Sequence, residues 1–275
     1  VSIPSIALPI GISFYTFQAV GYSIDVYRGT IKAEKNFITY ALFVSFFPQL
    51  VAGPIERAKN LLPQFYEEHK FDYNNVVEGL KLMLWGFFMK ICVADTLSEY
   101  VNAVFNNVEH HNGTSLILAT IFFTFQIYCD FGGYSNIAIG AARVMGFRLM
   151  ENFHYPYFSL NIKEFWRRWH ISLSSWFMDY VYIPLGGNRV KYPRHLLNLM
   201  ITFLVSGIWH GATWSFVLCG ALHGCYQVIG NMFRKYIYTP KYTTVISKVF
   251  STLFCFFIVA FAWIFFRANN VNDAF

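Results

Sequence analysis

Charged side chains are scarce in this chain of 275 residues. They make up 13% of it, whereas 56% of the residues are hydrophobic and 20% are aromatic. Ordinary soluble domains have roughly 25% charged residues, so this composition argues against a soluble surface and indicates a membrane protein. Lys and Arg number 21 against 15 Asp and Glu, giving a net charge of +6. The basic residues cluster in polar connections, which is how membrane proteins fix their orientation, so nucleic-acid binding is not implied.

The chain also lacks the patterns of a disulfide-linked or secreted domain. Its five cysteines stand singly in apolar stretches, without a CxxC pair, and we interpret them as small buried hydrophobic residues. There is no signal-peptide n-region and no internal repeat, which argues against an inverted-repeat transporter. Because the chain starts at Val1 and ends just after an apolar run, we expect a single membrane domain, residues 1–275, that lacks N- and C-terminal segments.

Long apolar stretches predict several membrane helices. A helix needs about 20 mostly apolar residues to cross the hydrocarbon layer. The stretches that qualify are 3–24, 76–97, 115–142, 196–210, 212–233 and 246–267. The run 39–53 is shorter and contains Pro48, so it predicts a short, broken or re-entrant element. The expected fold class is therefore an all-α, polytopic bundle of transmembrane helices.

The segment 162–181 differs from these stretches because it is amphipathic. Polar residues from Glu164 to Asp179 recur at helical spacing, and an apolar stripe that includes Trp166 and His170 follows the opposite face. This pattern predicts one helix that lies in the membrane interface or lines a cavity in the protein.

Two histidines, His170 and His210, stand beside tryptophans in apolar surroundings. Ionisable groups within membrane segments are candidates for function. His210 follows Trp209, and the small residues around it leave room for a substrate. Apolar surroundings disfavour the imidazolium, so His210 should be neutral, and a neutral imidazole is suited to general-base catalysis.

Other interpretations of the histidines remain open. Each could simply hydrogen-bond a neighbouring helix, and the same holds for His223 in the next apolar stretch. Paired histidines on facing helices can also hold haem iron, although no His-x3-His pair occurs here.

A second polar cluster occupies residues 126–147. Asp130 and Asn136 would need partners there, and the pair Gly132-Gly133 predicts a helix that breaks near Asp130 and lines a polar cavity. Alternatively, Asp130 pairs with an arginine, such as Arg143 or Arg168, and only stabilises the fold.

Three long motifs resemble the membrane-bound O-acyltransferases, and among them the alginate O-acetyltransferase branch. They are YCDFGGYSNIAIGAARVMGF (128–147), ENFHYPYFSLNIKEFWRRWHISLSSWFMDYVYIPLGGNR (151–189) and SGIWHGATWSFVLCGALHG (206–224). Upstream, PIGISFYTFQAVGYSIDVYRG (9–29) and FFPQLVAGPIERAKNLLPQF (46–65) fit the same pattern. The family usually reads DFSGYSD where this chain reads DFGGYSN, so Asp130 is the only acid in that heptapeptide.

The resemblance implies a helical bundle around a funnel or tunnel with a catalytic histidine at its narrow point. By motif, the catalytic histidine corresponds to His210 and the family's second histidine to His170. Members of this branch move acetyl groups, supplied from the cytoplasmic side, to a cell-surface polysaccharide with an extracytoplasmic partner. A related branch transfers D-alanine from a carrier protein to teichoic acid.

We therefore expect a multi-pass O-acyltransferase in the inner membrane of a bacterium. His210 would remove the proton of the acceptor hydroxyl and His170 would help orient the acyl group. No metal or tightly bound cofactor is expected. The acyl donor would be acetyl-CoA or an acyl-carrier thioester. The expected partners are the lipid bilayer and an extracytoplasmic acetyltransferase or polysaccharide-modifying protein. Ser206 is a conceivable nucleophile, although a packing role suits it better. The residues expected to bind substrate or line the tunnel are Asp130, Asn136, Trp166, Trp169, Trp209 and Trp214.

The rival class is a transporter or flippase for a lipid-linked glycan whose histidines relay protons. Such a protein predicts polar residues along a whole pathway. Here they gather at 130–136, 164–170 and 206–213, which favours a reaction centre.

Overall fold

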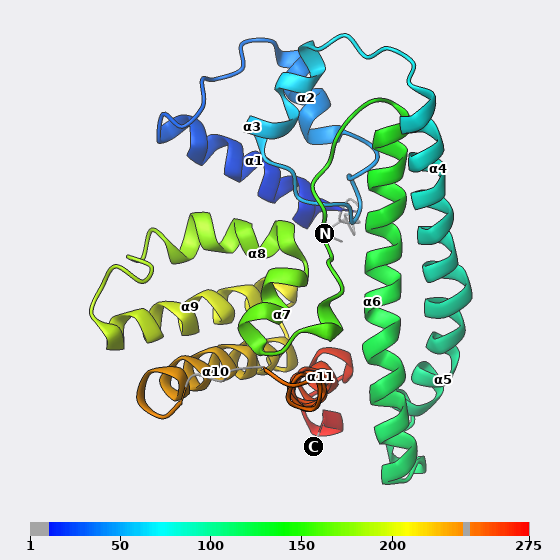
Figure 1. The fold of residues 1–275 in the computed structure, drawn as a ribbon, viewed down its shortest axis with the longest axis vertical. Helices are drawn as coiled ribbons and strands as arrows, with labels where there is room; N and C mark the ends of the chain where they lie inside the picture. Colours follow the sequence, from blue (N-terminus) through cyan, green and yellow to red (C-terminus); the bar gives the residue numbers. More distant parts are fainter. Residues whose placement is uncertain (1–10, 239–242, 275) are drawn as a thin grey trace, which may run out of the picture. The chain divides into compact units, whose positions relative to one another are not determined.

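The structure is a computed structural model that describes residues 11–238 and 243–274. These residues form helices and connections without a strand, as the composition predicts (Figure 1). The α-helices are α1 (Ile12–Tyr27), α2 (Phe37–Ser45), α3 (Ala58–Leu61), α4 (Tyr73–Phe87), α5 (Thr96–Phe105), α6 (Gly113–Val144), α7 (Ile162–Arg168), α8 (Ile171–Phe177), α9 (Tyr192–His210), α10 (Trp214–Tyr236) and α11 (Val245–Arg267). Two π-helical stretches, η2 (Phe88–Asp95) and η5 (Met178–Tyr182), extend α4 and α8.

The chain divides into two compact units. The first unit holds the described residues up to Phe88 together with Phe131–Asn152. The second unit holds Met89–Asp130 and the described residues from Phe153 onward. Helix α6 contributes its N-terminal part to the second unit and its C-terminal part to the first.

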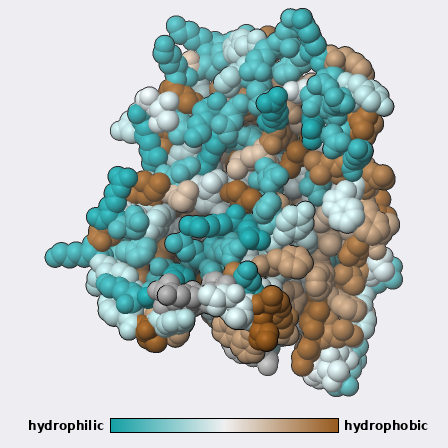
Figure 2. Space-filling view, in the orientation of Figure 1, coloured by the Kyte–Doolittle hydropathy of each residue, from teal (hydrophilic) through white to brown (hydrophobic). Residues whose placement is uncertain are grey.

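Three of the described helices are long and apolar enough to cross a membrane: α6, α10 and α11. They match three of the six stretches expected from the sequence. Of the other three, 76–97 becomes α4 followed by the π-helix η2, and 196–210 lies within α9. The stretch 3–24 falls partly outside the described residues, and its remainder belongs to α1. In the second unit, hydrophobic side chains gather on the surface over α11 and the N-terminal part of α6 (Figure 2).

Helix α6 is continuous, and the predicted break near Asp130 is wrong. Gly133 allows another helix to pack closely and does not introduce a kink. A Cβ on Gly86 of α4 would lie 2.5 Å from the carbonyl oxygen of Gly133, so the two backbones approach as closely as glycines allow. Figure 1 shows the two helices side by side.

The core of the first unit forms around α2, α3 and the end of α6. Phe43 and Leu61 are fully buried there and pack with Ala142. The predicted element 39–53 is short and broken, because α2 ends at Ser45 and turns follow. Its re-entrant character stays a prediction. The buried carboxylate of Glu56 accepts a hydrogen bond from the backbone N–H of Met150, which ties the chain after α6 to this core.

The second unit is organised around the hairpin of α9 and α10. These helices touch at Gly207 and Gly220, where a Cβ on Gly207 would lie 3.2 Å from the Cα of Gly220. Buried aromatic residues from α7 and α11, among them Phe165, Trp169 and Trp263, form the core beside the hairpin. The cysteines are all free: Cys129, Cys219 and Cys255 are buried as expected, whereas Cys92 and Cys225 are exposed.

Candidate functional site

The segment 162–181 is not one helix, and the break in it falls at His170. Helix α7 ends at Arg168 and α8 starts at Ile171. His170 has φ 44°, in the left-handed region that a non-glycine residue enters at a cost of roughly 1–3 kcal/mol. The backbone N–H of His154 donates to the carbonyl of Arg168 at 2.9 Å, which helps to hold this turn. The periodicity therefore predicted the helical residues correctly and missed a strained turn, which is a feature typical of functional sites.

His170 is buried, with 3% of its surface exposed. Its ring stacks on Phe153 with a centroid distance of 6.3 Å, and its Nδ1 lies 3.5 Å from the hydroxyl of Ser172. Burial lowers the pKa of His170 well below its ordinary value, and the charge that His210 can carry lowers it further. The ring is therefore neutral, and the two histidines lie within electrostatic reach of each other.

His210 is the last residue of α9. Three aromatic rings surround its imidazole: Trp209 at 4.7 Å, Phe266 at 5.3 Å and Phe216 at 6.4 Å between centroids. The side chain nevertheless remains exposed. Solvent therefore still reaches this histidine among its aromatic rings, so a substrate can meet it without a rearrangement of the fold.

Aromatic contacts connect the two histidines within the second unit. Consecutive ring centroids along this chain of contacts are 5.0 to 6.3 Å apart, close enough for direct packing. The chain runs from His170 through Phe153, Trp169, Trp263 and Phe266 to His210. A wall of this kind is apolar and holds both imidazoles in place.

The four tryptophans expected to line the tunnel occupy different positions. Trp166 lines a cavity in the second unit, and Trp209 packs against His210. Trp169 belongs to the buried core. Trp214 is 74% exposed and forms no part of that cavity wall.

Asp130 pairs with a lysine, and the alternative in which it pairs with an arginine such as Arg143 or Arg168 is wrong. Lys90 of η2 lies 2.7 Å from the carboxylate of Asp130 and also 2.7 Å from that of Asp95. The π-helix brings this lysine onto α6, which could not be foreseen from periodicity. The arginines have other partners: Arg143 donates to Asn75 and Arg168 binds Glu164.

Asn136 lies on the part of α6 that belongs to the first unit and is half-buried.

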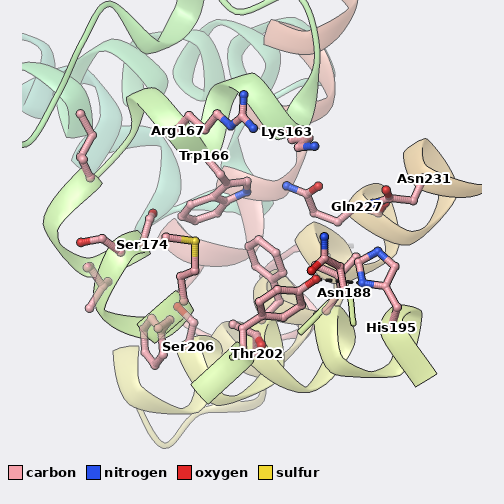
Figure 3. A pocket seen from close by; sticks show the side chains of 18 residues that line it. Lys163, Trp166, Arg167, Ser174, Asn188, His195, Thr202, Ser206, Gln227 and Asn231 are labelled. Carbon is pink, nitrogen blue, oxygen red and sulfur yellow. Dashed lines mark hydrogen bonds between the residues drawn. The ribbon is translucent and has the colours of Figure 1, made fainter. Parts of the chain in front are cut away.

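The cavity in the second unit has a volume of about 490 Å³ and lies between α7, α8, α9 and α10. Its walls are mainly apolar, and Ser206, one helical turn before His210, lies at its lining. Figure 3 shows Lys163 and Arg167 together at one side of it and His195 at another. Sizes of about 300–1,000 Å³ with a few convergent polar groups are usual for small-molecule sites.

Sequence reasoning missed several polar groups of this cavity. Lys163 and Arg167 are one helical turn apart on α7, and that spacing could have identified them as a basic pair on one face. The hydroxyl of Tyr182 lies 2.8 Å from Nδ1 of His195, a contact between separate elements that no local signal reveals. Among the described residues, no group of three or more His, Cys, Asp or Glu is placed to hold a metal ion.

The second unit thus links two histidines through a chain of aromatic rings and within electrostatic reach of each other, on a helical fold with candidate membrane spans. This combination defines a membrane protein with a histidine-centred site. The chain belongs to the membrane-bound O-acyltransferase (MBOAT) family, whose sequence profile matches residues 31–266.

Similar proteins act on bacterial glycans, according to their names. The chain is 43% identical over 270 residues to a probable alginate O-acetylase AlgI of Azotobacter vinelandii, covering 98% of this chain and 52% of that protein. It is 37% identical over 294 residues to a peptidoglycan O-acetyltransferase of Helicobacter pylori, covering 97% and 55%. It is 28% identical over 263 residues to a teichoic acid D-alanyltransferase of Bacillus subtilis, covering 90% and 67%. The chain spans about half the length of the alginate O-acetylases it matches.

Proposed function

We propose that this chain carries the acyl-transfer centre of an enzyme that moves an acyl group, in the simplest case acetyl, from a thioester to a hydroxyl of a cell-surface polysaccharide. The observation that supports it most is the neighbourhood of His210: a second, neutral histidine lies within electrostatic reach, and the cavity lining begins one helical turn away. The similar proteins act on alginate, peptidoglycan and teichoic acid, which supports a glycan acceptor.

In the proposed reaction, His210 is the general base. Its neutral ring accepts the proton of the acceptor hydroxyl while the hydroxyl oxygen attacks the thioester carbonyl carbon. The C–S bond then breaks, and the thiol leaves with the proton that His210 returns. His170 is neutral because it is buried, so it adds no positive charge that would hinder protonation of His210. Its proposed role is to help orient the acyl group.

The cavity is the proposed site of the donor. In the proposed complex, its mainly apolar wall surface packs against the reactive thioester and shields it from water, which limits hydrolysis. Lys163 and Arg167 carry positive charge at its side, and a donor such as acetyl-CoA or an acyl-carrier thioester carries phosphate. Ser206 lines the cavity and is placed to contact the donor, but no basic group lies at hydrogen-bond distance from it among the described contacts. Direct transfer to the acceptor is therefore simpler than transfer through an acyl-enzyme on Ser206.

The cellular setting follows from the same proposal. We propose a multi-pass protein of the bacterial inner membrane, with helices that enclose a funnel or tunnel. The donor enters from the cytoplasmic side, and the acceptor is presented on the other side by an extracytoplasmic polysaccharide-modifying partner. The three candidate membrane spans support the placement in a membrane.

The test is donor-dependent transfer by the purified protein in liposomes. Labelled acetyl-CoA and a labelled acetyl-carrier thioester are supplied in separate reactions with acceptor polysaccharide. Label on the polysaccharide supports the proposal and identifies the donor. Flipping of a lipid-linked glycan without acyl transfer would support a transporter instead and contradict it. Label trapped on the protein with donor alone would replace direct transfer by an acyl-enzyme.

A further inference from the structure

A histidine behind the cavity wall holds one of the wall's side chains. The indole N–H of Trp166 donates a hydrogen bond to Nδ1 of His223, at 3.3 Å, and the two rings are perpendicular at 4.9 Å between centroids. Trp166 lines the cavity (Figure 3), whereas His223 of α10 is 2% exposed and is not part of the lining. His223 therefore meets the cavity only through side chains that line it, and Trp166 is the lining residue that it holds by a hydrogen bond.

The plane of the His223 ring is fixed by its neighbours. Phe165 is parallel to it within 4° at 6.4 Å, and Phe203 lies within 27° of parallel at 6.4 Å. Phe203 also lines the cavity and meets Trp166 edge-on at 5.1 Å. Because aromatic rings hold the imidazole on several sides, Nδ1 stays directed at the indole.

Packing alone does not account for a histidine at this position. Since Nδ1 accepts a hydrogen bond, the ring proton is on Nε2. That nitrogen is buried and has no hydrogen-bond partner among the described residues. A buried donor without a partner is destabilising, and a leucine would avoid the cost. A histidine at this position can accept the hydrogen bond from Trp166, whereas a leucine cannot.

We infer that His223 is a positioning residue of the donor cavity: it holds the Trp166 indole in the wall against which the acyl donor binds. The inference rests on the proposed function for the identity of the ligand. It assigns His223 to donor binding and leaves proton transfer to His210. Loss of the His223 acceptor therefore loosens the wall and weakens donor binding, while the chemical step is preserved.

The test compares three substitutions and one control in the full protein in liposomes. His223→Leu removes the acceptor, His223→Asn keeps an oxygen acceptor close to the position of Nδ1, and Trp166→Phe removes the donor. Cys219→Ala is the matched control, because Cys219 is buried on α10 one turn before His223 and, among the described residues, the indole of Trp166 is hydrogen-bonded to His223 and not to Cys219. Kinetics with labelled acetyl-CoA give KM and kcat for each variant.

The expected result is a KM effect that depends on Trp166. His223→Leu raises the KM for acetyl-CoA about 3- to 10-fold, the value of one neutral hydrogen bond, with kcat within about twofold of the wild type. His223→Asn returns the KM most of the way to the wild-type value. In protein that already carries Trp166→Phe, adding His223→Leu does not raise the KM further. A fall in kcat at unchanged KM, or effects of the two substitutions that simply add, would overturn the inference.

A second measurement tests the positioning even if the protein transfers no acetyl group. In protein labelled with 5-fluorotryptophan, the Trp166 resonance is assigned with Trp166→Phe. It should shift or broaden in His223→Leu, return towards the wild-type position in His223→Asn and stay unchanged in Cys219→Ala. An unchanged Trp166 resonance in His223→Leu would refute the positioning role. Absence of transfer with the expected spectral changes would refute the proposed function alone.

Discussion

The backbones of Gly207 and Gly220 touch, and this contact sets the position of His210. A Cβ on Gly220 would lie 2.5 Å from the carbonyl oxygen of Phe203 and 3.0 Å from the Cα of Gly207. Neither neighbour can move aside as a flexible side chain could, because both are backbone atoms. His210 follows Gly207 by three positions at the end of the same helix, so its location depends on how closely α9 approaches α10.

Gly220→Ala should therefore lower both stability and transfer. Overpacking a tight contact costs typically about 1–3 kcal/mol, and separation of the two helices displaces His210. Thermal unfolding and the acetyl-transfer rate measure the two effects. Gly113→Ala is the control, because a Cβ there meets nothing within 4 Å. Equal melting temperatures for the two variants would contradict the role of this contact.

Buried His170 should make the protein less stable in mild acid. An unfolded histidine has a pKa of about 6.5, and burial holds the pKa of His170 well below that value. Between the two pKa values the unfolded state binds more protons than the folded state, so stability rises with pH there. Above pH ~6.5, His170 is neutral in both states and does not lower the free energy of unfolding. As the pH falls below ~6.5, the free energy of unfolding decreases by up to ~1.4 kcal/mol per pH unit.

His170→Asn tests this pH dependence. Asparagine does not titrate and tolerates the left-handed backbone that His170 adopts. The melting temperature of the variant should change less between pH 7.5 and pH 5.5 than that of the wild type. An identical change in both proteins would show that His170 does not titrate on unfolding in this range.

The ion pairs of Lys90 should be coupled. Lys90→Met leaves Asp95 and Asp130 without their cation, and Asp130 lies on a candidate membrane helix. An unpaired charge near lipid is costly, so Lys90→Met should lower the melting temperature in liposomes, and adding Asp130→Asn should restore part of it. Lys81→Met, which breaks the exposed pair with Glu78, is the control and should have little effect. Simple addition of the Lys90 and Asp130 effects would argue against the coupling.

The basic pair of the cavity should affect donor binding in a salt-dependent way. Lys163→Met and Arg167→Met should each raise the KM for acetyl-CoA, because each removes a charge near the phosphates of the bound donor. The KM of the wild type should rise with ionic strength more steeply than that of the variants. Lys59→Met, an exposed lysine of α3, should change neither quantity. A KM unaffected by both substitutions would place the donor elsewhere.

The sequence predicted features that depend on local pattern and composition. Helical periodicity gave the all-α fold, and the long apolar runs correspond to α6, α10 and α11. The family resemblance assigned both histidines to the site, and the structure brings His170 and His210 within electrostatic reach of each other. Their roles in the reaction stay predictions.

The features that sequence reasoning missed depend on contacts between distant segments. Gly133 was expected to break α6, but the close approach of α4 gives this glycine a packing role. The partner of Asp130 was sought among arginines of the same motifs, and a π-helix from elsewhere in the chain supplies Lys90. The sequence indicated that His223 is a packed, hydrogen-bonded histidine, but the identity of its partner, Trp166, depends on the contact between α7 and α10.

The central claim is that His210 acts as the base of acyl transfer. The most direct test is the single-turnover rate of acetyl transfer to polysaccharide by His210→Ala in liposomes, with folding confirmed by a wild-type melting temperature. Loss of a positioned general base reduces a rate by about 10²–10⁴, so the variant should lose rate in that range while it still binds the donor. A folded His210→Ala protein that transfers acetyl groups at the wild-type rate would contradict it.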